Sequence, residues 1–225
     1  MINALKSCGL ILFCLGWSCL VFGQQAREDL TKLAEKVDKH YNQLGSMRTQ
    51  FVETYSGAGM SRTESGTLWL KKPGKMRWEY TEPRDKVFVS DGQTAWFYVP
   101  GDQQARKAPV KKIDDIRSPL RFLLGKTKLL KEFRELGFVT SERALTPNGR
   151  VLRGVPKGME DRISTVLLEV SPEGRIERIA IEEVDGATTD FRFTEEVENI
   201  QVAENMFRFK PPAGVEIVEA KELGN

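Results

Sequence analysis

The chain has 225 residues, with 34 lysines and arginines against 32 aspartates and glutamates. These charges are dispersed, which disfavours a large nucleic-acid-binding surface. The three cysteines, Cys8, Cys14 and Cys19, all lie close to the N-terminus. The rest of the chain is therefore predicted to fold around an ordinary apolar core without disulfides.

The N-terminal segment 1–23 is predicted to be a secretory signal peptide. Lys6 gives it a basic start, and an apolar run follows from Cys8 to Phe22. The run is short for a membrane-spanning helix, and an uncleaved anchor is the alternative. The residues before Cys19 fit a lipid-attachment site poorly. We expect cleavage after Gly23 and a soluble, exported single domain over residues 24–225.

A helix is predicted from Arg27 to Leu44, where apolar residues recur at helical spacing and Gly45 provides a stop. His40, the only histidine, lies on this helix. A metal site or a catalytic triad needs partner side chains that the sequence does not place beside it. We therefore expect a surface or half-buried histidine, and neither a metal nor a cofactor.

The stretch from Gly66 to Pro100 carries the strongest β signal. Short aromatic and β-branched runs are separated by Pro73-Gly74 and by Ser90-Asp91-Gly92-Gln93, as in a twisted antiparallel meander. Met76 and Trp78 share one face of a strand. Apolar residues also occupy the other face of several strands, so an apolar segment is expected to cover that second face.

Further strands are expected on both sides of this meander. Ser46 to Tyr55 precedes it, and a turn is predicted from Ser56 to Gly59. Beyond Phe138, alternating residues predict strands at Val151 to Val155, Ser164 to Val170, Arg175 to Ile181, Thr188 to Thr194 and near Val215 to Val218. Without a repeat or linker, these strands favour one domain with a large antiparallel sheet.

The middle of the chain, from Gly101 to Phe133, does not continue the β pattern. Gly101 to Lys112 is polar and is expected to form turns. Ser118 to Gly125 has the N-cap, the proline and the terminal glycine of a short helix that is apolar almost all round. Such a helix must lie against a large apolar surface. A second short helix is predicted from Lys126 to Phe133. The fragment Gly125-Lys126-Thr127 is no phosphate-binding loop, because the earlier glycine of that motif is missing.

No catalytic motif is found, and we expect a protein that is not an enzyme. The pairs Glu182-Glu183 and Glu195-Glu196 consist of neighbouring residues that point to opposite faces of a strand, so they are expected to be solvated surface charges. The excess of apolar residues has two interpretations from pattern alone. It could line a cavity for an apolar ligand, or it could be the core of an ordinary β-sandwich.

Several segments resemble, in the same order, the periplasmic outer-membrane lipoprotein carriers of the LolA family. The resemblance spans essentially the whole chain after the signal peptide and rests on Gly66 to Gly74, Arg77 to Tyr80, Pro83, Val89 to Gly92, Trp96 to Pro100, Gln104, Ser118 to Gly125 and Phe207 to Val215.

This resemblance implies a mainly β fold, an incomplete and strongly curved antiparallel barrel covered by a lid of short helices. It implies a periplasmic chaperone, expected to be monomeric, that holds the acyl chains of lipoproteins between barrel and lid. It also implies loading by an ABC-type releasing complex in the inner membrane and delivery to an acceptor lipoprotein in the outer membrane.

The resemblance also suggests which residues contact the lid and line the acyl-chain cavity. Lys72 stands where the family has an arginine that bonds the lid, and lysine keeps the charge but loses the bidentate geometry. Met76 stands where the family often has a large apolar residue tied to ligand exchange. The expected acyl-chain cavity is lined by Phe51, Met76, Trp78, Val89, Trp96, Leu120, Leu123 and Leu124.

Three other functions stay open at this stage. The first is a sensor or regulatory domain of the same fold that binds lipid or lipoprotein, although such proteins usually carry an extra domain. The second is an exported hydrolase, which lacks a recognisable catalytic set. The third is the acceptor lipoprotein itself, which the poor lipidation site at Cys19 disfavours.

Overall fold

The computed structural model describes residues 11–110, 122–123 and 128–220, with side chains from residue 25 onward. In chain order its elements are α1 Ile11–Gln43, β1 Ser46–Gly57, β2 Met60–Lys71, β3 Lys75–Glu82, β4 Lys86–Asp91, β5 Thr94–Tyr98, β6 Gln104–Pro109, α2 Leu129–Glu132, β7 Phe133–Phe138, β8 Arg150–Pro156, β9 Ile163–Val170, β10 Ile176–Glu183, β11 Thr188–Glu198, the 3₁₀ helix η3 Glu204–Phe207 and β12 Glu216–Glu219.

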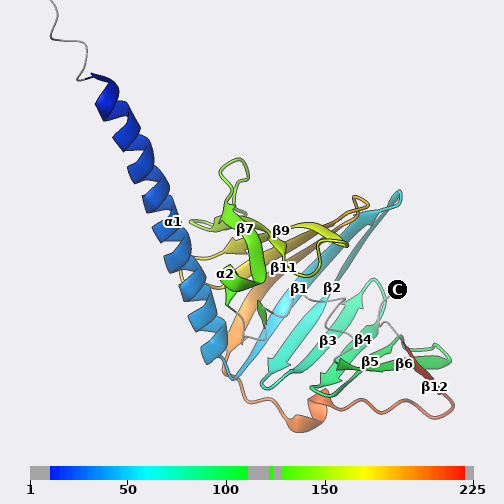
Figure 1. Ribbon diagram of the computed structural model, residues 1–225. Helices are drawn as coiled ribbons and strands as arrows, with labels where there is room; N and C mark the ends of the chain where they lie inside the picture. The colour runs from blue at the N-terminus through cyan, green and yellow to red at the C-terminus, as the bar shows by residue number, and fades with distance from the viewer. Residues whose placement is uncertain (1–10, 111–121, 124–127, 221–225) are drawn as a thin grey trace, which may run out of the picture.

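All of these strands belong to one sheet of 12 strands, in the order β12-β6-β5-β4-β3-β2-β1-β11-β10-β9-β8-β7. The sheet is open and curved, and α1 stands along one side of it (Figure 1). The predicted fold class, a mainly β incomplete barrel, is confirmed. Every neighbouring pair is antiparallel except β12 and β6, which are parallel, so the expectation of a wholly antiparallel sheet is wrong at this edge.

The first hairpin is longer than the sequence predicted. β1 continues to Gly57 and β2 begins at Met60, so only Ala58 and Gly59 form the turn. Both have a positive φ, 51° and 75°, which is the backbone of a two-residue type I′ hairpin turn. β2 therefore begins ahead of the predicted β-rich stretch from Gly66 to Pro100.

Two expectations for the middle of the chain are wrong. The segment from Gly101 to Lys112 contains β6, because buried Ala105 and Ala108 fit between neighbouring strands although the segment looks polar. The helix predicted from Lys126 to Phe133 is reduced to α2, and Phe133 instead begins β7 by pairing with β8. The predicted helix from Ser118 to Gly125 lies outside the described residues, apart from Phe122 and Leu123.

The second half of α1 packs against the sheet. Ala34, Val37 and Tyr41, at helical spacing, are at most 2% exposed and belong to the main core cluster. The Tyr41 hydroxyl accepts a hydrogen bond from the backbone N–H of Ile176 at 2.9 Å, which fixes the helix to the start of β10. In the part of the chain that the structure describes, neither helix combines the length and apolar character needed to cross a membrane.

Candidate functional site: the apolar inner face of the sheet

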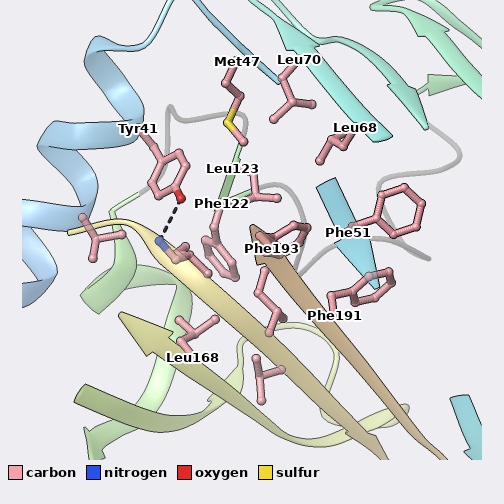
Figure 2. Close-up of a cluster of buried hydrophobic side chains, with 14 of the residues drawn as sticks. Tyr41, Met47, Phe51, Leu68, Leu70, Phe122, Leu123, Leu168, Phe191 and Phe193 are labelled. Carbon is pink, nitrogen blue, oxygen red and sulfur yellow. Dashed lines mark hydrogen bonds between the residues drawn. The ribbon is translucent and has the colours of Figure 1, made fainter. Parts of the chain in front are cut away.

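One face of the sheet, here called the inner face, carries a continuous apolar cluster. Cross-strand pairing places Phe51 of β1 beside Phe193 of β11, and Leu68 of β2 beside Trp78 of β3. Period-2 alternation turns all four side chains to the same side. Figure 2 shows Phe51, Leu68 and Phe193 converging with Met47, Leu70, Leu168 and Phe191 from neighbouring strands.

Aromatic rings dominate the centre of this face. The Phe51 ring lies 4.8 Å from the rings of both Trp78 and Tyr80, in edge-to-face geometry, and Trp78 lies 5.7 Å from Phe191. Trp78 is 1% exposed, yet its indole N–H has no hydrogen-bond partner among the described residues. Because an unpaired buried donor costs free energy, Trp78 offers this N–H to any polar atom that enters the cluster.

Phe122 and Leu123, the described part of the predicted apolar helix, lie inside this cluster. Each is 3% exposed, and the Phe122 ring stacks on Phe133 at 5.1 Å. Figure 2 shows both between Tyr41 and Phe193. Leu120 and Leu124, also expected in the cavity, lie outside the described residues. The described pair therefore covers the inner face with apolar side chains.

The predicted cavity residues fall on both faces of the sheet. Phe51, Trp78 and Leu123 come together in the inner-face cluster, and the partly buried Met76 packs against it beside Leu70. Val89 and Trp96 form a cross-strand pair on the opposite face, because Val89 is out of phase with the inner-face residue Phe88. The structure therefore does not bring Val89 and Trp96 together with the others.

The C-terminal segment covers that opposite face. Phe209 places its ring 5.5 Å from Trp96 and 5.6 Å from Tyr98, while Phe207 of η3 is 1% exposed. The expected apolar cover for the second face is thus the segment around η3. It packs on Trp96, which was expected to line the cavity, and on Tyr98 of the same strand.

Lys72, the expected lid contact, lies where several elements meet. The ammonium group of Lys72 donates a hydrogen bond to the backbone carbonyl of Tyr41 near the end of α1. The backbone N–H of Lys72 donates to the backbone carbonyl of Gly45 at 2.9 Å. A positive charge at a helix C-terminus is favourable because the last carbonyls have no partner within the helix. Leu123 lines the same small crevice as Lys72, so this lysine lies between α1 and the covering segment.

Polar residues bound the apolar cluster at one end. The Tyr80 hydroxyl donates to Glu53 at 2.7 Å, and Lys86 pairs with Glu64 at 2.6 Å, with both side chains of that pair nearly buried. Toward β6, an open cleft of about 590 Å³ lies beside Phe97 and is lined by polar and apolar side chains. The apolar surface is therefore a limited patch with polar groups at its margins.

The structure brings together a second group of polar side chains that the sequence did not predict to be neighbours. Glu196 and Glu198 of β11 approach His40 of α1, with carboxylate oxygens 3.5 and 3.8 Å from its Nε2. The expectation that the pair Glu195-Glu196 is solvated is wrong for Glu196, whose side chain is only 10% exposed. Burial, together with the charges of Glu196 and Glu198, raises the pKa of the neighbouring Tyr41 hydroxyl.

Taken together, the fold and site define a single-sheet β protein whose inner face presents an apolar surface, against which Phe122 and Leu123 pack. Residues 42–210 match the family described as outer membrane lipoprotein carrier protein LolA. The chain belongs to this family of lipoprotein carriers.

Individual relatives support this assignment. The chain is 30% identical over 177 residues to an outer-membrane lipoprotein carrier protein of Nitrosospira multiformis, an alignment that covers 77% of this chain and 82% of the relative. A carrier of the same description from Alkalilimnicola ehrlichii is 29% identical over 219 residues, covering 94% of this chain and 93% of the relative.

Solved structures resemble the chain more distantly. A LolA superfamily protein from Nitrosomonas europaea aligns with a TM-score of 0.45 and 13% identity, covering 79% of this chain and 96% of that one. The lipoprotein LppX of Mycobacterium tuberculosis aligns with a TM-score of 0.46 and 12% identity, covering 78% of this chain and 98% of that one.

Proposed function

We propose that this protein is a periplasmic chaperone, without catalytic activity, that carries acylated lipoproteins from the inner to the outer membrane. Residues 1–23 would be removed on export, leaving one carrier domain. The observation that carries the proposal is the apolar inner-face cluster, which lies under the separate segment that contains Phe122 and Leu123. Family membership supplies the cargo, since the relatives are named outer-membrane lipoprotein carrier proteins.

The physical task is to hide acyl chains from water during transfer. Each buried methylene contributes about 0.8 kcal/mol, so an acylated protein does not leave a membrane unaided at a useful rate. The inner face offers Phe51, Trp78 and Met76 as a non-directional apolar surface, and such a surface accepts acyl chains of different lengths. The Trp78 N–H supplies a donor for an ester carbonyl at the head of the chains.

Cargo and the covering segment compete for the same surface. Phe122 and Leu123 fill part of the inner-face cluster, so acyl chains that bind there must displace these side chains. A ligand shifts such an equilibrium only by the difference between its affinities for the two states. Binding is therefore weaker than the apolar contact area alone predicts, and this allows release. Leu120 and Leu124 are proposed to belong to the same lid.

Lys72 is proposed to influence the lid through its position. It ties the end of α1 to the β2–β3 turn and lies beside Leu123. Loss of its ammonium group would loosen the surface on which the covering segment rests.

The loading and accepting partners are proposed to be an inner-membrane ABC-type releasing complex and an outer-membrane acceptor lipoprotein, with the carrier acting as a monomer.

The first test is lipoprotein release. The purified protein is added to spheroplasts of a Gram-negative bacterium, and the soluble fraction is analysed for acylated lipoprotein in a one-to-one complex with it. We expect such complexes to form. If lipoproteins stay on the membrane while the protein binds free lipid, it is instead a lipid-binding or sensor domain of the same fold.

A second test locates the acyl chains with tryptophan fluorescence. Two proteins are compared, one keeping only Trp78 and the other only Trp96 outside the predicted signal peptide, with phenylalanine at the other positions. Brominated acyl chains quench a tryptophan that they touch. We expect quenching of Trp78 and little of Trp96, which lies under Phe209 on the opposite face. Equal quenching would contradict the inner-face site.

A further inference from the structure

A separate cluster joins α1 to the sheet, away from the centre of the apolar cluster. His40 lies in the last turns of α1, and Glu196 and Glu198 lie at the end of β11. β11 contains an irregularity opposite Arg48 to Gln50, and Glu195 there has a φ of 53°. Glu196 lies within this bulge and Glu198 follows it, and the carboxylates of both reach His40 of α1.

The cluster brings three potential metal ligands together. The His40 Nε2 lies 3.5 Å from Oε1 of Glu196 and 3.8 Å from Oε1 of Glu198, and all three ligand atoms lie within 4.8 Å of one another. The side chains of His40 and Glu196 are only 13% and 10% exposed. Nε2 of His40 and Oε1 of Glu196 are buried without a hydrogen-bond partner among the described residues.

The arrangement of His40, Glu196 and Glu198 is unfavourable unless a bound ion or another partner satisfies their polar atoms. Two carboxylates converge on one point, and one of them is nine-tenths buried with an unpaired oxygen. Buried polar atoms are normally hydrogen-bonded, and buried charges are paired or coordinate a metal. The unpaired nitrogen and oxygen face each other across 3.5 Å, which is longer than a good hydrogen bond.

We propose that His40, Glu196 and Glu198 bind a divalent transition-metal ion of the Zn²⁺ type. Zinc bonds to imidazole nitrogen and carboxylate oxygen are about 2.0–2.2 Å, so two ligands on a tetrahedral ion lie about 3.4 Å apart. The two separations from His40 Nε2, 3.5 and 3.8 Å, are close to that value, and the two carboxylate oxygens lie within 4.8 Å of each other. Imidazole disfavours Mg²⁺ and Ca²⁺. Glu198 is 36% exposed, which leaves the outer side open to a water as fourth ligand.

A metal ion here would join the helix to the sheet. Other described links at this end of α1 include the Tyr41 bond to β10, the Lys72 bond to the Tyr41 carbonyl and the bond from the Leu129 N–H to Asp38. The proposed ion adds a link from His40, the residue before Tyr41, to β11. Because the three ligands come from distant parts of the sequence, only the folded protein holds them together, and bound metal therefore stabilises the fold.

Zinc binding is measured by isothermal titration calorimetry on untagged, chelator-treated protein. We expect one ion per chain and an increase in the thermal unfolding temperature. Glu196→Gln and His40→Gln should each weaken binding by more than about 100-fold, since loss of an outer partner alone typically costs 10–100-fold. Glu195→Gln, at the exposed neighbouring position, is the matched control and should bind as the wild type does.

The single histidine gives a second readout that does not depend on the variants folding. His40 is the only imidazole in the chain, so its ring ¹⁵N resonances report on this cluster alone. We expect them to shift on addition of Zn²⁺, and Co²⁺ to give the visible absorption of a tetrahedral site. If the resonances respond to pH but not to either metal, the cluster is a histidine–carboxylate ion pair and the proposal is overturned.

Discussion

The hydrogen bond between Tyr41 and Ile176 gives a direct test of how α1 is held on the sheet. The Tyr41 side chain is 2% exposed, and its hydroxyl accepts from the Ile176 N–H at 2.9 Å. Tyr41→Phe keeps the ring and leaves that buried N–H without a partner. Such an orphaned donor costs about 1–3 kcal/mol. Since 1 kcal/mol shifts the unfolding temperature of a chain of this size by about 2–4 °C, we expect a decrease of about 2–12 °C.

The measurement is thermal unfolding by circular dichroism, together with urea unfolding to obtain the free energy difference. Hydrogen exchange at the Ile176 amide should also accelerate, because that N–H loses its acceptor. Tyr55→Phe removes a hydroxyl from a half-exposed position on β1 and is the matched control, expected to change stability little. An unfolding temperature equal to that of the wild type, with unchanged exchange at Ile176, would refute this account of the anchor.

Two further predictions follow from close contacts elsewhere. Hydrogen bonds from Lys71 and Lys75 lower the pKa of Glu204 from 4.5 to about 2. A depressed carboxylate pKa stabilises the fold above about pH 4.5, and this contribution is lost between about pH 4.5 and about pH 2. The stability difference between wild type and Glu204→Gln in urea should therefore shrink over that range, and a constant difference would contradict the pairing. A Cβ at Gly66 would lie 2.0 Å from the backbone oxygen of Glu79, so Gly66→Ala should destabilise by about 3 kcal/mol. The control Gly137→Ala, with nothing within 4 Å, should be nearly neutral in the same urea titration.

Local alternation was enough to predict much of the inner face. Met76 and Trp78 were placed on one face of a strand by period 2, and the structure places both there, with Trp78 opposite Leu68. Alternation could not identify which aromatic residues face the cluster in the next strands. Val89 and Trp96 are as apolar as Trp78, and only the later segment around Phe209 reveals that they are covered on the other side.

Other features depend on contacts that sequence alone does not contain. β6 looks polar because its buried positions are alanines, which give little hydrophobic signal. The approach of Glu196 to His40 depends on the pairing of β11 with β1 and on a bulge at Glu195. Neither the strand pairing nor the bulge produces a local sequence pattern near His40. The adjacent pair Glu195-Glu196 was expected to be solvated, and the burial of Glu196 does not follow from the local sequence.

The place where β1 meets β11 also determines when the sheet can close. Phe51 pairs with Phe193, so the central seam joins residues separated by more than half of the chain. Contacts this distant in sequence form slowly, whereas the β1–β2 and β4–β5 hairpins need only neighbouring residues. A chain that emerges N-terminus first can therefore form separate hairpins. Its β1 strand cannot pair with β11 until β11, the last long strand, has emerged. Until then the edge of β1 is unpaired, and we expect the partly emerged chain to depend on protection from aggregation.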